Sequence, residues 1–264
     1  MSHFYNCKKE PTFEPEVATP HQAKQKGAKV YPSVTTVLGI VKDQFLDSIY
    51  KPRMMYELTK QGAGNSWQEV ERLTYGTRTH PTTGEQMPSS EFGTAVHETI
   101  EDMINSLIYD QKRECPHNYD YDEWATPFYE WVLENNIKPL ACEKVVFNDY
   151  VKIAGSVDFI GHDEGGSLFL ADYKCRTNTK GYERTKGKAK TYAKDCEQLA
   201  IESWMLMKHH KLDYLPKCIS VIIDCDTKEH HHRTWNDDEV QWGIKNAKLA
   251  SKIYWSKRMK PVIK

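Results

Sequence analysis

The clearest chemical signal in the chain is an acid and a lysine separated by one residue. Asp172 and Lys174 follow the apolar run Leu168–Ala171, which is typical of a buried strand. Because side chains alternate along a strand, both polar groups point to the same face at its end. A second acid, Asp158, lies near the end of the preceding apolar run. Open α/β sheets tend to hold ligands at the carboxyl ends of their strands, so these residues are candidates for a site.

Two carboxylates beside a lysine suit a metal-dependent hydrolysis. A hard divalent cation such as Mg²⁺ takes oxygen ligands and keeps several waters. A neighbouring lysine can orient or deprotonate a water, or neutralise a developing anion. These groups fit hydrolysis of a phosphodiester, where a metal activates water and stabilises charge on the phosphate. For this short motif alone, a salt bridge between Asp172 and Lys174 is the alternative.

Three neighbouring strands are expected to position these groups. The runs 140–147, 151–160 and 167–174 are separated by turn signals and predict an antiparallel meander. The last run is expected to be buried on both faces over most of its length. Glu143 lies among apolar residues in the first run, where a charged side chain needs a partner such as a metal or a cation.

Helical periodicity surrounds the three strands. A long loop is expected at 76–90, and the three consecutive histidines from His230 are expected to be exposed. Ser33 or Thr35 is expected to cap a first short helix, and Asn236 or Asp237 the last one. The remaining elements are helices at 33–41, 43–61, 67–74, 91–104, 124–136, 189–210 and 238–258, with further strands at 217–226 and 230–235.

This order of elements predicts an α/β (α+β) fold with a mixed central sheet flanked by helices. Residues 1–28 are polar and are expected to form a flexible arm. Residues 29–264 are expected to form a single domain. Its helical N-terminal part would span 29–137 and its core, with the candidate site, 138–264.

Composition excludes several classes of protein. The 264 residues carry a formal net charge of −1, so any surface for nucleic acid must be local. No apolar run is long enough to span a membrane, and the N-terminus lacks the apolar core of a signal peptide. The seven cysteines are an odd number without a C-x-x-C pair, which favours a reduced, intracellular, soluble protein.

A local basic segment follows the acid–lysine strand. Residues 174–194 contain eight Lys or Arg against one acid, with tyrosines interleaved. Such a segment could hold a phosphate backbone and stack bases, although a solvated loop is the alternative. The candidate DNA-binding residues are Arg176, Tyr182, Arg184, Lys186, Lys188, Lys190 and Tyr192.

Five short motifs follow one another along the chain: Gly93–His97, Glu143, Ala154–Asp158, Asp172–Lys174 and Gln198–Ala200. In this order, and on these types of element, they resemble the PD-(D/E)XK nuclease superfamily and, within it, the RecB-type exonuclease branch. The stretch Tyr31–Thr35 also resembles an N-terminal element of mitochondrial genome maintenance exonucleases and related phage proteins.

The resemblance implies a restriction-endonuclease-like core and a Mg²⁺ or Mn²⁺ cofactor. Lys174 would orient or activate the attacking water, Gln198 and Tyr192 would position the site or the DNA, and Glu143 would support them. The implied metal ligands are His97, Asp158, Asp172 and the carbonyl of Tyr173.

Two departures from this family pattern stand out. Glu202 occupies the position where many relatives carry a tyrosine at the end of the glutamine motif, which adds an acid near the site. Some relatives also hold an iron–sulfur cluster with four cysteines. Cys218 and Cys225 are too few and wrongly spaced for one, so no cluster is expected.

The resemblance therefore implies a metal-dependent exonuclease that acts on DNA ends, single-stranded or otherwise, in replication, recombination or repair. It would work inside the cell, in the host cytoplasm if it is encoded by a phage. The chain contains no G-x-x-x-x-G-K-[ST] motif for unwinding DNA by itself. A structure-specific or site-specific endonuclease of the same superfamily and a DNA-binding protein without cleavage are the alternatives.

Overall fold

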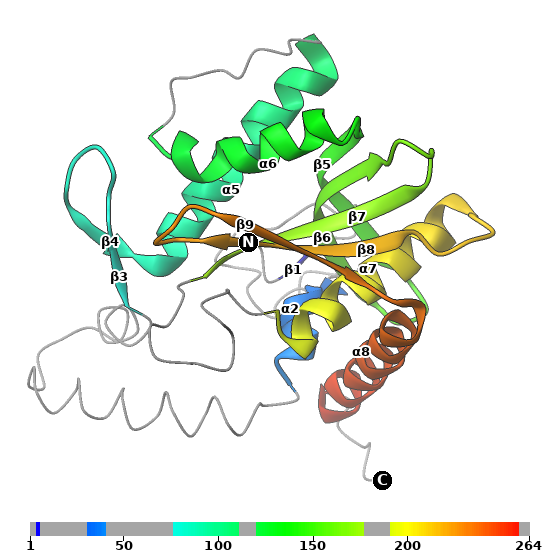
Figure 1. The fold of residues 1–264 in the computed structure, drawn as a ribbon. Helices are drawn as coiled ribbons and strands as arrows, with labels where there is room; N and C mark the ends of the chain where they lie inside the picture. Colours follow the sequence, from blue (N-terminus) through cyan, green and yellow to red (C-terminus); the bar gives the residue numbers. More distant parts are fainter. Residues whose placement is uncertain (1–3, 6–30, 41–75, 111–119, 177–190, 259–264) are drawn as a thin grey trace, which may run out of the picture.

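Consecutive apolar runs in the second half of the chain build a five-stranded mixed sheet (Figure 1). The computed structural model describes residues 4–5, 31–40, 76–110, 120–176 and 191–258. Strands β7 and β8 run parallel, and the other neighbouring pairs are antiparallel. The antiparallel meander predicted for the first three of these strands is confirmed. In spatial order the strands are β5 (Lys138–Asn148), β6 (Ile153–His162), β7 (Leu168–Arg176), β8 (Lys217–Asp224) and β9 (His230–Trp235).

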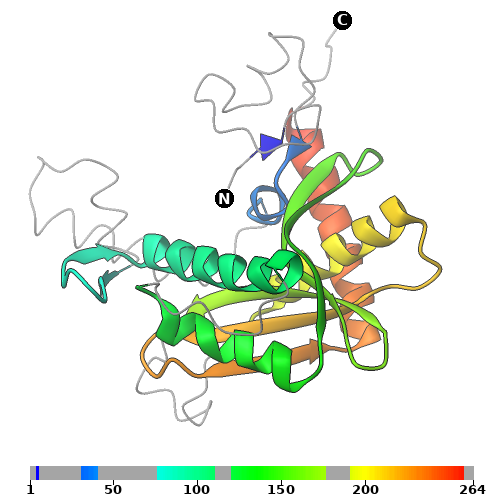
Figure 2. The ribbon, with the colours of Figure 1, turned by 90° about the horizontal axis from the view of Figure 1, so that it is seen from above.

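Helices cover both faces of this sheet, so the predicted α/β class with a mixed sheet is confirmed (Figure 2). One face carries α5 (Ser89–Asn105), its π-helical extension η2 (Ser106–Asp110) and α6 (Asp122–Glu134). The other face carries α2 (Val34–Leu38), α7 (Ala193–His210) and α8 (Asp237–Arg258).

Strand β7 is buried on both faces because its apolar residues alternate between two cores. Phe169, Ala171 and Tyr173 pack into the core under α5 and α6. Leu168 and Leu170 pack into the core formed with α7 and α8. This alternation confirms the predicted faces of the strand and places Asp172 and Lys174 on the side of α7.

Local capping sets the starts of two helices. The Ser33 side chain accepts a hydrogen bond from the backbone N–H of Thr36 at the start of α2. At the start of α8, Asn236 and Glu239 each accept a hydrogen bond from the other's backbone N–H, both at 3.0 Å. Both capping predictions are therefore confirmed.

Two short antiparallel pairs lie outside the main sheet. Within the loop predicted at 76–90, β3 (Thr77–Thr79) pairs with β4 (Gln86–Pro88), so that part of the prediction is wrong. Three-residue strands are too short to give a detectable alternation. Within the arm predicted at 1–28, β1 (Phe4–Tyr5) pairs with β2 (Tyr31–Pro32).

The histidine run on β9 is less exposed than predicted. The Nε2 atom of His230 lies 2.9 Å from the Trp124 carbonyl oxygen, and the ring packs near Phe128. Burial lowers the pKa of His230 to about 4. His232 alone of the three is exposed, with its ring 4.4 Å from that of Trp131. The partial burial of His230 depends on α6, which lies about a hundred residues earlier in the chain.

The helices predicted at 43–61 and 67–74 lie outside the described residues. Within the described part of the chain, no helix is long and apolar enough to cross a membrane.

Candidate active site

The candidate site lies where β6 and β7 separate. These strands pair from Phe159–His162 against Leu168–Ala171 and then diverge. Strand β6 pairs with β5 along its whole length, and β7 pairs with β8 from Phe169 to Arg176, so each strand keeps its outer neighbour beyond this point. The last pair, Phe159 with Ala171, puts Asp158 and Asp172 directly after it, one on each side of the opening. The separated strands leave room for polar side chains inside an otherwise apolar core.

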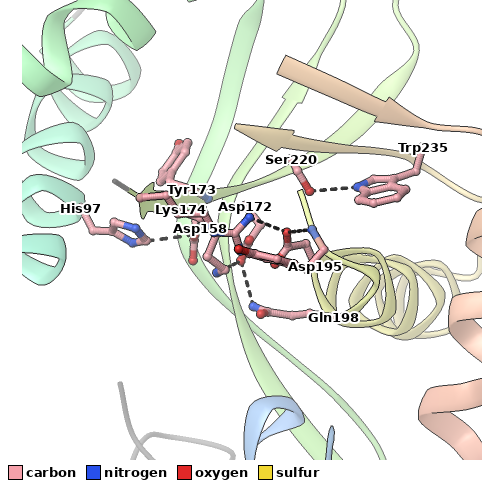
Figure 3. A network of polar contacts seen from close by, with 11 residues as sticks. His97, Asp158, Asp172, Tyr173, Lys174, Asp195, Gln198, Ser220 and Trp235 are labelled. Atoms are coloured by element: carbon pink, nitrogen blue, oxygen red, sulfur yellow. Dashed lines mark hydrogen bonds and ion pairs between the residues drawn. The ribbon is translucent and has the colours of Figure 1, made fainter. Parts of the chain in front are cut away.

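Beyond the last β6–β7 pair, the Asp158 side chain accepts a backbone hydrogen bond from β7. Its Oδ2 accepts a hydrogen bond of 2.8 Å from the backbone N–H of Tyr173, and the residue is buried. Burial raises the pKa of Asp158 to about 6, although the Lys174 ammonium lowers it. His97 of α5 lies on the other side, with its Nδ1 3.7 Å from Oδ2 of Asp158 (Figure 3).

Asp172 is the centre of the polar network on the α7 side (Figure 3). Its Oδ1 accepts from Lys174 Nζ at 2.6 Å and from Gln198 Nε2 at 2.9 Å. Its Oδ2 is buried without a hydrogen-bond partner. Burial and the charge of Asp158 raise the pKa of Asp172 to about 7, against the lowering effect of Lys174.

Lys174 keeps its charge although it is largely enclosed. Burial lowers its pKa, but the carboxylates of Asp172 and Asp158 outweigh burial and raise the pKa above its ordinary value. The side chain therefore presents an ammonium group, which donates hydrogen bonds and carries no lone pair for accepting a proton.

His97, Glu143 and Asp158 form a set with cation-binding geometry. One potential ligand atom from each lies within 4.8 Å of the other two. Burial and the nearby Lys174 lower the pKa of His97 to about 4, so its imidazole is neutral, as a metal ligand must be. Its ring also packs edge-on against Tyr173 at 5.5 Å.

Glu143 reaches this set through an irregular backbone. It has a φ of 46°, a left-handed conformation inside β5, and it lies across from Asp158 between two regular pairs. Its carboxylate accepts a hydrogen bond of 2.7 Å from the Ser156 hydroxyl. The side chain is exposed, unlike the buried position that its apolar neighbours suggested.

The predicted ligands thus fall into two groups. His97 and Asp158 lie together with Glu143, whereas Asp172 lies in the adjoining network with Lys174 and Gln198. The unpartnered Oδ2 of Asp172 and the excess of carboxylates over ammonium groups are what a divalent cation would complement. The residues present therefore fit a hard divalent cation.

Two residues predicted to bind DNA meet near the start of α7: Arg176, the last residue of β7, and Tyr192, the N-cap of α7. Arg176 donates two hydrogen bonds to the Asp195 carboxylate, at 2.7 and 2.8 Å, and lies 4.5 Å over the Tyr192 ring. Its guanidinium is thus held by the protein, while Tyr192 is exposed. The other five predicted DNA-binding residues, from Tyr182 to Lys190, lie outside the described residues.

The sequence places Glu202 near the site as an additional acid but assigns it no role. Glu202 of α7 is 1% exposed, and burial together with the charges of Asp172 and Asp158 raises its pKa well above the ordinary value. The signal for it was its position one turn after Gln198 on the same helix face.

Comparisons with known proteins assign no family or function to this chain. No family model and no curated protein matches the chain. Twenty-seven chains of solved structures match it. One of them, the crystal structure of SSO0001, is 15% identical and covers 80% of this chain and 87% of that chain, with a TM-score of 0.29. A likeness at that level carries no argument about the function of this protein.

Proposed function

We propose that this protein is a metal-dependent DNA exonuclease with a PD-(D/E)XK core. The observation that carries the proposal is the meeting of Asp158, Asp172 and Lys174 in the opening between β6 and β7. The motif spacing allowed an isolated salt bridge, but Gln198 and His97 converge on the same two acids from opposite helices. Convergence of four elements on buried acids is characteristic of a reactive site rather than of a surface ion pair.

The fold supports the superfamily assignment without depending on any one motif. An antiparallel meander carries the acids, a helix after it carries Gln198, and β8 then returns parallel to β7. This is the order of elements that the resemblance implies for a PD-(D/E)XK core.

In this proposal the cation is Mg²⁺ or Mn²⁺. His97, Glu143 and Asp158 would hold it, with Asp172 and the Tyr173 carbonyl on the neighbouring strand as further oxygen ligands. A bound divalent cation lowers the pKa of water and stabilises negative charge on a phosphate. Tyr173 supports Asp158 by donating its backbone N–H to the carboxylate, which fixes one oxygen and leaves the other accessible.

Lys174 has the role of orienting water and neutralising charge. Its Nζ has three N–H donors, and Asp172 accepts one of them at 2.6 Å. A remaining donor can hold a water or a phosphate oxygen beside the acids. Gln198 positions this pair because it binds the same Oδ1 of Asp172.

The DNA is expected to approach from the basic segment 174–194, and Tyr192 is an exposed ring available for stacking. Arg176 is already paired with Asp195, so its contribution is to hold the start of α7 next to the acids. Binding of DNA by the remaining basic residues stays a prediction.

The test uses end-labelled linear single- and double-stranded DNA and a circular single strand, each with Mg²⁺, Mn²⁺ or EDTA. We expect metal-dependent degradation of the linear DNA alone. In Lys174→Ala and Asp172→Ala, the rate should fall by about 10²–10⁴, the usual contribution of such groups. Lys217→Ala is the matched control. This exposed lysine lies at the start of β8, away from Asp172 and Lys174, and forms an ion pair with Asp163.

Each alternative gives a different result. Cutting of the circular strand would assign an endonuclease of the same superfamily. Binding of DNA and metal without any cleavage would assign a non-catalytic DNA-binding protein. Full cleavage by both site variants would refute the assignment of these residues.

A further inference from the structure

A pocket lies between the starts of α7 and α8, beside β9. Its volume is about 490 Å³, within the range of about 300–1,000 Å³ that is typical of small-ligand sites. The first turn of α7 forms one wall, and the proposed reaction uses none of the lining residues. The other lining side chains are two indoles, a guanidinium and two carboxylates, from Trp235, Trp242, Arg233, Asp238 and Glu239.

The strand register puts this pocket beside the candidate active site. Asp172 on β7 pairs with Ser220 on β8, and Ser220 pairs with Arg233 on β9. Paired residues share a face, so these three side chains all lie on the α7 side of the sheet. On the same face, Nε1 of Trp235 donates to the Ser220 hydroxyl at 2.9 Å (Figure 3). Two strand spacings therefore separate the backbones of Asp172 and Arg233, which is about 10 Å.

The walls of the pocket are held in place by the protein itself. The Arg233 guanidinium lies 3.8 Å from the centre of the Trp235 ring. It donates to the Thr191 hydroxyl and to the Glu239 carboxylate, both at 2.7 Å. At Gly243, a Cβ atom would lie 2.8 Å from a side-chain carbon of α7, so the glycine allows the start of α8 to pack against α7. A site that is formed in advance loses little entropy when a ligand binds.

Trp242 contributes an exposed aromatic face to this pocket. Its side chain is 45% exposed although it lines the cavity. Stacking of a planar ring on this indole would remove apolar surface from water and gain a favourable contact between aromatic rings. A nucleobase is such a ring, and stacking of bases on aromatic side chains is a general way to hold single-stranded nucleic acid.

The basic segment 174–194 ends at this pocket. Thr191 accepts a hydrogen bond from Arg233, and Ala193 lines the cavity. Between them, Tyr192 is 54% exposed. A strand whose phosphates contact this segment would therefore have its bases beside Tyr192 and Trp242.

The charges in the pocket favour a base over a phosphate. Glu239 is paired with Arg233, and Asp238 is an exposed acid in the first turn of α8. Carboxylates repel phosphate oxygens, but they accept hydrogen bonds from the exocyclic amino group of a base, as they do from cytosine N4. Guanidinium planes such as that of Arg233 can also stack on bases. The lining is therefore complementary to the ring and edge of a nucleobase.

We propose that this pocket binds one unpaired nucleobase of the DNA strand, stacked on Trp242, while the end of the same strand lies at Asp158 and Asp172. This inference rests on the proposed function, because the two acids define where the strand ends. At about 3.4 Å per nucleotide of a stacked strand, the separation of about 10 Å places this base about three nucleotides from the reacting phosphate. Trp242 is thus a binding residue that sets the position of the strand.

The experiment measures binding of fluorescently labelled single-stranded oligonucleotides to the full-length protein by anisotropy. Ca²⁺ replaces Mg²⁺, because it neutralises the carboxylates without the octahedral geometry of Mg²⁺. In a series of probes, each of the first few nucleotides from either end is replaced in turn by an abasic sugar. One abasic position, about three nucleotides from an end, should weaken binding to wild type by about 5- to 150-fold, the loss expected for one stacked base. Trp242→Ala should weaken binding of the intact probe by a similar factor and abolish the sensitivity to that position.

Two further variants control this measurement. Leu249→Ala removes another exposed apolar side chain of α8, 47% exposed and outside the pocket, and should bind all probes as wild type does. Trp242→Phe keeps an aromatic face and should retain the sensitivity to the abasic position. The series of probes with wild type needs no substitution, so it tests the pocket even if Trp242→Ala fails to fold.

The outcomes separate this inference from the proposed function. If no abasic position weakens binding to wild type, the nucleobase pocket is overturned, and metal-dependent cleavage of linear DNA would leave the proposed function intact. An abasic penalty that persists in Trp242→Ala would assign the stacking to another ring, such as Tyr192, and overturn the role of Trp242. Failure of wild type to bind any of the probes would overturn both proposals.

Discussion

Asp158 and His97 face each other at 3.7 Å, and burial shifts their pKa values in opposite directions. It raises the pKa of Asp158 to about 6 and lowers that of His97 to about 4. Both shifts favour the neutral form of the side chain, because a low-dielectric site penalises either charge. The pair is therefore no conventional salt bridge. Two such groups held together are better suited to share a cation than to stabilise the metal-free protein.

The pKa of Asp158 predicts a pH-dependent cost. Its folded-state pKa lies above the unfolded value near 4, so its contribution to stability falls as pH rises from 4 to 6. In EDTA, Asp158→Asn should therefore gain stability relative to wild type across this range and keep a gain of about 2 to 3 kcal/mol above it. Melting curves of both proteins at pH 4.5, 6 and 8 measure the difference. A variant less stable than wild type at pH 8 would contradict this account.

At the scale of elements, hydrogen bonds connect the end of β7 to the start of α7. Arg176 closes β7, and its two hydrogen bonds to Asp195 span the link between strand and helix. Asp195 also accepts the backbone N–H of Tyr192 at 2.7 Å, which satisfies a donor at the helix start. Because Gln198 follows on the same helix, this contact holds the amide that positions Asp172.

Asp195→Ala should destabilise the protein by about 2 to 4 kcal/mol, because it removes both charge-assisted hydrogen bonds that the mostly buried guanidinium of Arg176 makes to this carboxylate. Chemical denaturation at pH 7 measures the loss. Lys194→Ala is the control, since it changes the preceding residue and leaves the pair with Arg176 intact; it should stay within about 0.5 kcal/mol of wild type. An equal loss of stability in the two variants would show that the Arg176–Asp195 pair does not stabilise the packing of α7 against β7.

At the scale of the whole molecule, the sheet separates two cores, and the candidate site draws on both sides. His97 comes from α5, which packs in one core, and Gln198 comes from α7, which packs in the other. The acids lie on β6 and β7 between them. A ligand bound at this point would join helices on opposite faces of the sheet.

Divalent cations should therefore raise the melting temperature of the whole domain. At a concentration of about 100 times its Kd, a bound ion adds about 2.7 kcal/mol, which corresponds to roughly 5 to 10 °C for a domain of this size. Thermal melts with Mn²⁺ and with EDTA at pH 8 test this effect, and Asp158→Asn should reduce it. The same increase in wild type and variant would assign the stabilisation to other surface sites.

Much of the candidate site was predictable because it depends on local pattern. Period-two alternation identified β7 and the common face of Asp172 and Lys174, and the motif order identified His97 and Gln198. The positions of Glu143 and Glu202 were less accessible. Glu143 depends on a left-handed backbone in β5, and Glu202 depends on the space that Gly155 leaves on β6. Neither condition has a periodic signature in the sequence.

The sequence by itself determined the types of most elements, their order, two helix caps and the face of each residue on β7, because these follow from backbone geometry within a few residues. Only the tertiary structure decided that β6 and β7 separate after Phe159 and Ala171. It also placed α5 and α7 against the opening and held Arg176 against Asp195. These features arise from packing between segments distant in the chain, where burial converts a short acid–lysine motif into a strongly perturbed site.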